Sequence, residues 1–289
     1  MSGNLKLTIA YDGSGFHGSQ RQRNGRSVQE DLENGLSGLF GQETQVDLAG
    51  RTDSGVHAIG QVASVRDARP NLSDERMVRA INAHLAGDLA VLACERKERT
   101  FHARFDATWR EYRYRIWWGT AQPLLRYQVW QRNSPLDIEV MAKGAEPLQG
   151  PVDLSSFAGL GAGVPGSAMS NGSRGTVRTI RHCSVREIAP WWGIAPGAGS
   201  GAEIRIIADG FLPHSVRTIA SALAEIGSGR RPVDWIDQLI GLGDRRQGPQ
   251  TAPPHGLVLW RVGYGHEVPD PGPHGEQTAD ERFIGRTIG

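Results

Sequence analysis

The stretch Ala49-Gly50-Arg51-Thr52-Asp53-Ser54-Gly55-Val56-His57-Ala58 lies between two strand-like runs, 44–48 and 61–65. Its Asp-Ser-Gly sequence is typical of a turn, because Asp and Ser side chains bond nearby backbone groups and glycine adopts positive φ. Turn chemistry does not account for Arg51, two residues before Asp53. A cation within reach favours the charged form of a carboxyl group, so this pair can keep a shielded carboxylate ionised. Such a carboxylate can act as a nucleophile or a general base.

The composition describes a globular chain rather than a disordered one, with 289 residues, 38% of them hydrophobic and 22% charged. This length suffices for one large or two ordinary domains. The net charge of +1 does not by itself predict a nucleic-acid partner. Charge is concentrated locally, since residues 96–132 contain nine Lys and Arg against three acids. That segment is either a solvated sheet face or a basic surface that binds nucleic acid.

Several features exclude other classes of protein. Cys94 and Cys183 are far apart and form no CxxC motif, so we expect neither a disulfide framework nor a metal site. No run approaches about 18 apolar residues and no signal-peptide core is present, so we expect a cytoplasmic protein without membrane contact. Neither a GxxxxGK[ST] loop nor a GxGxxG fingerprint after a strand occurs, and no nucleotide cofactor is predicted.

The apolar patterns predict an α+β fold. Leu5, Leu7, Ile9 and Tyr11 alternate with polar or small residues, as in a half-buried strand. A capping box at residues 27–30 opens a helix, a second helix begins at Ser73, and a further helix is predicted over 136–150. Strands and helices in this order place the helices on one face of an antiparallel or mixed sheet.

The stretch around Asp53 closely resembles the signature of the TruA family of tRNA pseudouridine synthases. Further segments resemble that family in the same order, so that the likeness extends over residues 5–263: 11–22, 101–107, 210–217 and 251–259. Two positions depart from the family pattern. Ser19 stands where the family usually has tryptophan, and Ser215 stands where it usually has methionine.

The resemblance implies two ferredoxin-like (RRM-like) α+β halves, related by a pseudo-two-fold, with the catalytic cleft between them and a homodimer that binds tRNA. We place the N-terminal domain at residues 1–106 and the C-terminal domain at 107–265. Residues 266–289 form an acidic, Pro- and Gly-rich tail that is predicted to be disordered. The Gly- and Ser-rich stretch 159–175 and a loop carrying Trp191 and Trp192 interrupt the second domain.

The resemblance also implies roles for single residues. Asp53 would be the catalytic residue, and Tyr112 would stack on the target base. Arg217 would pair with Asp53, while Arg51 would help to orient it or fill the space that the flipped base leaves. Leu257 would wall the uracil pocket.

Residues 111–116 alternate strictly, with Tyr112 and Tyr114 on one face of a strand and Arg113 and Arg115 on the other. We expect the arginine face to be a basic exterior. RNA-backbone contacts are expected from these two arginines and from the basic run after the first strand: Arg21, Arg23, Arg113 and Arg115.

The function implied by the resemblance is isomerisation of uridine to pseudouridine in tRNA, at positions 38–40 of the anticodon stem-loop. The reaction involves no net redox change or hydrolysis, so no cofactor is expected. Whether Asp53 attacks the ribose or the base, or abstracts a ribose proton, stays open. A non-catalytic RNA-binding module of the same fold is one alternative, which Ser19 and Ser215 support. A carboxylate-dependent hydrolase is another, but it requires a second acid near Asp53.

Overall fold

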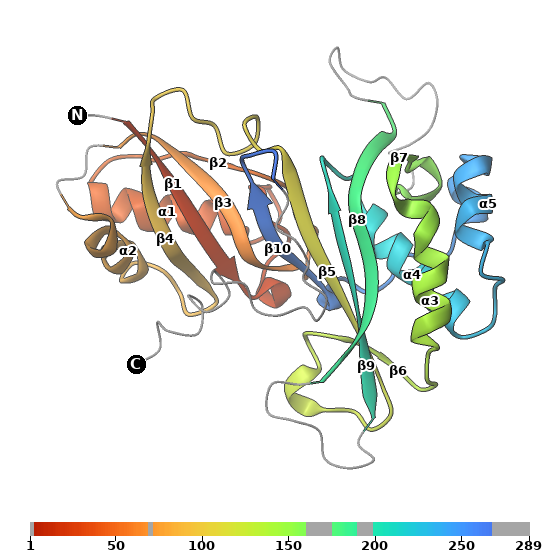
Figure 1. The fold of residues 1–289 in the computed structure, drawn as a ribbon. Coiled ribbons are helices and arrows are strands. Elements are labelled where there is room, and N and C mark those ends of the chain that lie inside the picture. The colour runs from red at the N-terminus through yellow and green to blue at the C-terminus, as the bar shows by residue number, and fades with distance from the viewer. Residues whose placement is uncertain (1–2, 69–71, 160–174, 190–198, 268–289) are drawn as a thin grey trace.

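A single mixed sheet organises the molecule, which we describe from a computed structural model over residues 3–68, 72–159, 175–189 and 199–267. The sheet has 10 strands in the order β4-β1-β3-β10-β5-β9-β8-β7, with β2 beside β3 and β6 beside β5. Figure 1 shows α1 and α2 packed behind the N-terminal strands and α3, α4 and α5 at the opposite end. The predicted α+β class is confirmed.

The N-terminal half follows the order strand, helix, strand, strand, helix, strand. Its elements are β1 (Gly3–Tyr11), α1 (Val28–Phe40), β2 (Val46–Leu48), β3 (His57–Ala68), α2 (Asp74–Asn82) and β4 (Leu89–Lys97). In space the strands lie in the order β4-β1-β3-β2, and all of these neighbours are antiparallel. The expected strand from Leu5 to Tyr11 is therefore β1, whose apolar side chains are buried.

The C-terminal half has the same order of main elements. They are β5 (Trp109–Trp118), α3 (Ile138–Ala145), β8 (Val177–Ile188), β9 (Ser200–Ala208), α4 (Ser215–Gly227) and β10 (Leu257–Gly263). These strands lie in the order β10-β5-β9-β8, which matches the order in the first half. Three additions were not predicted: β6 (Trp130–Arg132), β7 (Gly150–Asp153) and α5 (Trp235–Leu242).

The last strand, β10, joins the two halves. It runs parallel to β3, with Val258 opposite His57 and Leu259 opposite Ala58. On its other edge it pairs antiparallel with β5, where Leu257 lies opposite Tyr114. The loop that carries Asp53 leads directly into β3, so β10 places this loop beside β5 of the second half.

The ends of the helices follow local chemistry. The Ser27 hydroxyl accepts the backbone N–H of Glu30, as the capping box predicts, and Gly41 ends α1 with a φ of 68°. The helix predicted over 136–150 is shorter than expected. It ends at Ala145, because Pro147 cannot continue the ladder and Gly150, with a φ of 88°, turns the chain into β7.

A layer of ion pairs covers the face of β5 opposite Tyr112. Glu111 accepts from Arg113 Nε at 2.9 Å and from Arg205 Nε at 2.8 Å. Glu203 accepts from Arg115 Nε at 2.9 Å and from Arg186 Nη2 at 2.8 Å. Arg186 lies on β8, the strand next to β9. Both glutamates are buried, so the layer belongs to the interior of the fold.

The predicted basic exterior is therefore wrong for Arg113. Its side chain is 8% exposed and its guanidinium lies over the Trp260 ring, 3.8 Å from the centroid. Arg115 is 28% exposed and bound to Glu203. The alternation of faces is as expected, but the acids on β5 and β9 pair with the arginines and draw them inward. Sequence spacing could not show this pairing, because Glu203 lies on another strand.

Two of the expected segments lie outside the described residues, namely most of 159–175 and the loop with Trp191 and Trp192. The same holds for the tail from residue 268. Within the described ranges, no helix has both the length and the apolar character needed to cross a membrane.

Candidate active site

A cleft with a volume of about 1150 Å³ lies between the two halves at the Asp53 loop. Its lining includes all five residues to which the sequence assigned a role at the target base: Arg51, Asp53, Tyr112, Arg217 and Leu257. The four arginines expected on the RNA backbone are absent from this lining: Arg21, Arg23, Arg113 and Arg115. The structure thus brings the first group together and leaves the second group elsewhere.

Asp53 receives two basic side chains from one segment of the second half. Arg217 Nη1 donates to Asp53 Oδ2 at 2.9 Å, and His214 Nε2 lies 3.5 Å from the same oxygen. The other carboxylate oxygen, Oδ1, has no hydrogen bond or ion pair with any residue that the structure describes. Asp53 is one-third exposed, so Oδ1 is the oxygen that can meet a substrate.

Arg217 is fixed at two points. Its Nε donates to the carbonyl of Ala252 at 2.8 Å, while its Nη1 reaches Asp53. Arg217 lies in the first turn of α4, where the helix macrodipole disfavours a cation. The carboxylate of Asp53 offsets this conflict, and the predicted pairing of the two residues is present in the structure.

Arg51 does not form the predicted pair with Asp53. Its side chain is exposed, and no ion pair joins it to Asp53 within the described part of the chain. The two residues are close in sequence, and Thr52 between them is buried and bonded to Tyr11 and Ser19. The cation beside Asp53 comes instead from α4.

The floor of the Asp53 loop is a network of buried polar groups. Thr52 Oγ1 lies 2.8 Å from the hydroxyl of Tyr11, and the Thr52 N–H donates to Ser19 Oγ at 2.8 Å. Gln61 donates to the carbonyl of Gly50 at 2.8 Å. Burial raises the pKa of Tyr11 to about 12, so its hydroxyl keeps its proton at neutral pH. These contacts hold the loop rigid beneath Asp53.

Ser19 and Ser215 have clear structural roles. Ser19 is fully buried and bonds Thr52 twice, since its N–H also donates to the Thr52 carbonyl at 3.1 Å. Ser215 is also buried, and its hydroxyl donates to the carbonyl of Leu212 at 2.8 Å. Both departures from the family pattern therefore support the site rather than leave a gap in it.

Two further details fix the loop. Gly55 has a φ of 78° and Gly18 a φ of 103°, and a side chain at Gly18 would lie 3.1 Å from the Thr52 carbonyl. His57 is buried, and its Nδ1 accepts the backbone N–H of Gly13 at 3.1 Å. This contact ties His57 to the loop that follows β1.

Tyr112 and Leu257 form the apolar wall of the cleft. Both are buried, and the Tyr112 ring meets the Phe211 ring edge-on, with 5.2 Å between centroids. Burial is the main cause that raises the pKa of Tyr112 far above its ordinary value. The phenol is therefore neutral, and its hydroxyl can donate a hydrogen bond as well as accept one.

His214 is a candidate site residue that sequence reasoning missed. It caps α4 with a φ of 64°, and it is the only non-glycine residue with positive φ in the described part of the chain. A left-handed conformation is costly for a residue with a Cβ and is found mostly at functional sites. The available signal was an imidazole three positions before Arg217, on a segment already assigned to Asp53.

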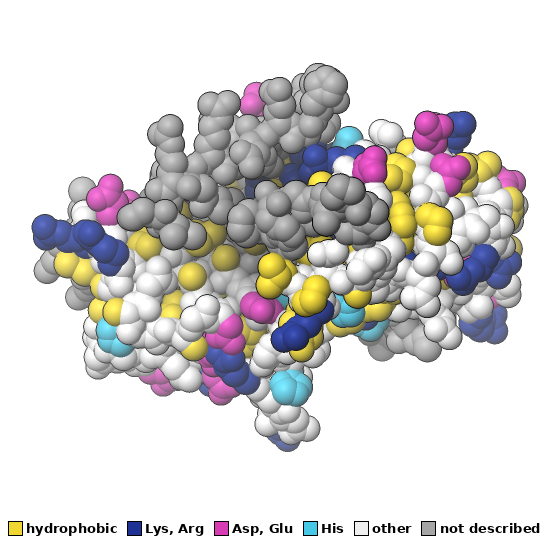
Figure 2. All heavy atoms as spheres, turned by 90° about the horizontal axis from the view of Figure 1, so that it is seen from below, with side chains coloured by type: hydrophobic (Ala, Val, Ile, Leu, Met, Phe, Trp, Pro, Cys, Tyr) yellow, Lys and Arg dark blue, Asp and Glu magenta, His cyan; other side chains and the backbone are white. Residues whose placement is uncertain are grey.

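The rest of the cleft is rich in cations. Its lining also contains Arg66, Arg104, Arg110 and Arg178. On the face in Figure 2, basic and acidic side chains are interspersed, in agreement with the small net charge. No group of three or more His, Cys, Asp or Glu side chains suited to a metal occurs among the described residues.

Comparison with known proteins agrees with this geometry. A family model described as tRNA pseudouridine synthase matches residues 7–106 and 145–265. A protein of Myxococcus xanthus named tRNA pseudouridine synthase A is 36% identical over 280 residues, which cover 96% of this chain and 98% of that protein. Proteins of the same name from Klebsiella pneumoniae (strain 342) and Coxiella burnetii (strain Dugway 5J108-111) are 37% and 38% identical. They cover 90% of this chain, with 89% and 92% of their own lengths matched.

The α+β fold, the aspartate loop and the family match together define an enzyme of the isomerase class, a pseudouridine synthase. More narrowly, the chain belongs to the tRNA pseudouridine synthase A family, in which its relatives match over nearly their whole length.

Proposed function

We propose that this chain converts uridine to pseudouridine in tRNA, at positions 38–40 of the anticodon stem-loop, with Asp53 as its catalytic residue and without a cofactor. The observation that carries the proposal is the state of the Asp53 carboxylate. Oδ2 is bound by Arg217, Oδ1 has no such partner among the described residues, and Asp53 lies on the lining of a cleft that contains several arginines. A carboxylate held through one oxygen is oriented for reaction at the other.

The reaction is balanced within the substrate. The bond between ribose C1′ and uracil N1 breaks, the uracil turns, and a bond forms between C1′ and C5. The proton on C5 is lost and N1 gains one, so the product is an isomer. Asp53 Oδ1 would act as the nucleophile or as the base that removes a ribose proton, and Arg217 would stabilise the negative charge of the carboxylate.

The target uridine has to leave its stack, which costs a few kcal/mol and is easiest in a loop or at a weak pair. Tyr112 would stack on the uracil and Leu257 would wall the pocket; both line the cleft beside Asp53, which supports these roles. Arg51 is exposed at the same cleft, where it can enter the space that the base leaves. Arg21 and Arg23 would contribute contacts to the phosphate backbone.

We further propose that the two halves are ferredoxin-like units related by a pseudo-two-fold. The matching strand orders, β4-β1-β3-β2 and β10-β5-β9-β8, support this. A homodimer, which the family resemblance implies, and a cytoplasmic location, which the apolar pattern of the sequence favours, complete the proposal.

The decisive experiment measures tritium release from C5-labelled uridine in an unmodified tRNA transcript. We expect release with the wild-type chain and none with Asp53→Asn. Asp209→Asn is the control, since it changes another carboxylate of the cleft and should leave release within about twofold of wild type. Release by neither wild type nor variant, with tRNA still bound, would favour a non-catalytic RNA-binding module. Release by both wild type and Asp53→Asn would show that Asp53 is not the catalytic residue.

A further inference from the structure

Phe105 is the most exposed of the large hydrophobic side chains in the described part of the chain, at 76% exposure. It lies on the lining of the cleft that holds Asp53, next to Arg104. The Arg104 guanidinium lies 5.8 Å from the centre of the Phe105 ring, and the His102 ring lies 4.3 Å from it. An aromatic ring is thus presented to solvent at the rim of the candidate active site, beside a cation and an imidazole.

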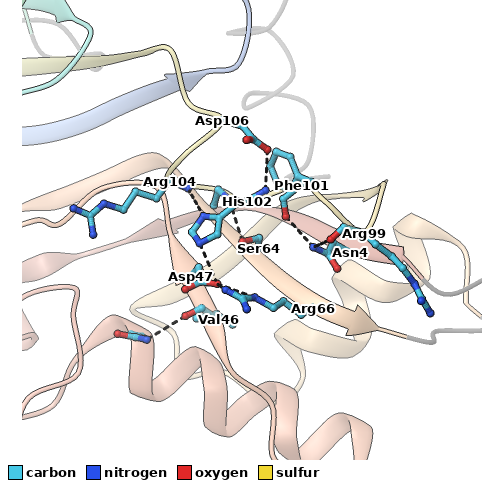
Figure 3. Close-up of polar contacts among 12 residues, drawn as sticks. Asn4, Val46, Asp47, Ser64, Arg66, Arg99, Phe101, His102, Arg104 and Asp106 are labelled. Carbon is cyan, nitrogen blue, oxygen red and sulfur yellow. Dashed lines mark hydrogen bonds and ion pairs between the residues drawn. The ribbon is translucent and has the colours of Figure 1, made fainter. Parts of the chain in front are cut away.

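The segment 101–107 that carries Phe105 is firmly attached to the N-terminal half. The Ala103 N–H donates to the buried Ser64 hydroxyl at 3.1 Å, and Asn4 donates to the carbonyls of Arg99 and Phe101 at 3.0 and 2.8 Å (Figure 3). On the other side, the Tyr264 hydroxyl donates to the Ala103 carbonyl at 2.8 Å. Contacts from three directions fix the backbone of this segment.

His102 is fixed as well. The Arg104 N–H donates to His102 Nδ1 at 3.1 Å, so Nδ1 acts as an acceptor and the ring proton is placed on Nε2. Nε2 points to Asp47, 3.5 Å away, which Arg66 also binds (Figure 3). The backbone N–H of His102 donates to Asp106 Oδ2 at 2.9 Å. The ring against which Phe105 rests is therefore held in place before any ligand arrives.

The attachment of segment 101–107 does not depend on the Phe105 ring. The contacts that hold 101–107 come from backbone groups and from the side chains around Phe105, whereas the Phe105 ring itself buries little surface. A phenyl ring left in water lacks the stabilisation that its burial would supply. A rigid loop that presents such a ring is suited to bind a flat partner without a large entropic cost.

We propose that His102, Arg104 and Phe105 form a stacking site for an unpaired base of the bound tRNA, adjacent to the uridine that enters the Asp53 cleft. The Phe105 ring takes the face of the base and Arg104 takes the neighbouring phosphate. The inference rests on the proposed function, because the ligand is the RNA strand that leads into that cleft. The occupant follows from charge, since arginines line the same cleft and favour a polyanion over an apolar peptide.

Stacking uses the π-face that every base has, so this site tolerates all four bases. The site distinguishes unpaired from paired bases, but it does not distinguish one type of base from another. The site would therefore select loops and weakly paired ends, which is where a uridine can be extruded most easily.

The test is the affinity of full-length variants for an unmodified tRNA transcript, measured in an Asp53→Asn background so that turnover cannot interfere. Phe105→Leu keeps an apolar side chain without the flat ring and should weaken binding roughly 5- to 150-fold, whereas Phe105→Trp should bind at least as tightly as the parent. Leu242→Ala, an exposed hydrophobic side chain on α5 and away from the cleft, is the matched control and should change nothing.

Salt dependence separates the two parts of the site. Arg104→Ala should lower the slope of log affinity against log salt by about 1, whereas Phe105→Leu should leave the slope unchanged. Equal affinity of the parent and Phe105→Leu would overturn the stacking site. Equal loss in Phe105→Leu and Phe105→Trp would do the same, because a flat ring would then be no advantage. These readouts concern binding alone, so they are independent of whether wild type releases tritium.

Discussion

Arg217 donates to Asp53 across 2.9 Å, although 164 positions separate the two residues in the chain. Asp53 belongs to a loop of the first half and Arg217 to the first turn of α4 in the second half. The site is thus completed only where the halves meet. The second anchor of Arg217 is the carbonyl of Ala252. Ala252 belongs to the segment that leads into β10, the strand that joins the two halves.

The shape of the Arg217 guanidinium predicts a loss of activity in Arg217→Lys. An ammonium group keeps the charge but cannot bond Ala252 and Asp53 at once in the same geometry. We expect kcat/KM to fall about 10- to 150-fold, corresponding to one charge-assisted hydrogen bond of about 1.5–3 kcal/mol. Tritium release at limiting substrate measures this. Arg246→Lys is the control, because it changes an exposed Arg–Asp pair outside the cleft; equal losses in both variants would contradict the prediction.

The strained backbone of His214 predicts opposite effects on stability and activity. His214→Gly removes a Cβ from a residue with a φ of 64°, so we expect the free energy of unfolding to stay equal or to rise by up to about 1 kcal/mol. Loss of the imidazole beside Asp53 should lower kcat/KM about tenfold. His214→Asn, which tolerates the same φ, controls for the backbone. Full activity in the glycine variant would show that the imidazole has no part in the reaction.

The ring and the hydroxyl of Tyr112 can be tested separately. Tyr112→Phe keeps the ring that would stack on uracil and removes the hydroxyl, so tRNA affinity should change by less than about twofold while kcat falls. Tyr112→Leu removes both and should weaken binding as well, by about 1–3 kcal/mol. Denaturant unfolding of each variant reports any loss from the core, because Tyr112 is buried. Unchanged kcat in Tyr112→Phe would exclude a role for the hydroxyl.

The buried Glu203 predicts a pH-dependent stability. Burial opposes its ionisation, but Arg115, Arg113 and Arg186 outweigh burial and hold its pKa below the usual value. Its contribution to stability is therefore full above the unfolded pKa and is lost as the pH falls through the folded pKa. Glu203→Gln should lower the free energy of unfolding by about 3–5 kcal/mol at neutral pH.

The difference in free energy of unfolding between wild type and Glu203→Gln should become smaller on acidification, because Glu203 of the wild type is then protonated and loses its charge. Unfolding curves of both proteins at neutral and acidic pH measure it. Glu187→Gln on the exposed edge of β8 is the control, with little change expected. A difference that stays constant with pH would contradict the assignment.

The sequence predicted the parts of this structure that local patterns determine. The alternation in β1 and the capping box of α1 each point to an observed feature, because each depends on neighbours in the chain. The pair of Arg217 and Asp53, which are distant in the chain, was predicted from the family resemblance. The motif around Asp53 predicted a loop before a strand, and Gly55 with its positive φ makes that turn.

The parts that were missed depend on neighbours in space. Arg113 was expected outside although Glu111, its partner on the same strand, lies two residues away; its second partner, Glu203, lies on β9, and the pairing of β5 with β9 cannot be obtained from alternation. Arg51 was expected at Asp53 because sequence distance was used in place of side-chain direction. The role of His214 depends on a backbone angle that no residue pattern specifies.

The position of β10 has a consequence for how this protein is made. β10 follows every other described strand in the chain, yet it occupies the middle of the sheet between β3 and β5. Until β10 is made, β2 covers this edge of β3 only at residues 63–65, and His57 and Ala58 lack the strand with which they later pair. An open stretch of sheet edge of this kind invites pairing with other chains. Nascent chains that stop before Leu257 lack the junction between the two halves, so any quality control that recognises open sheet edges would distinguish them from chains that contain β10.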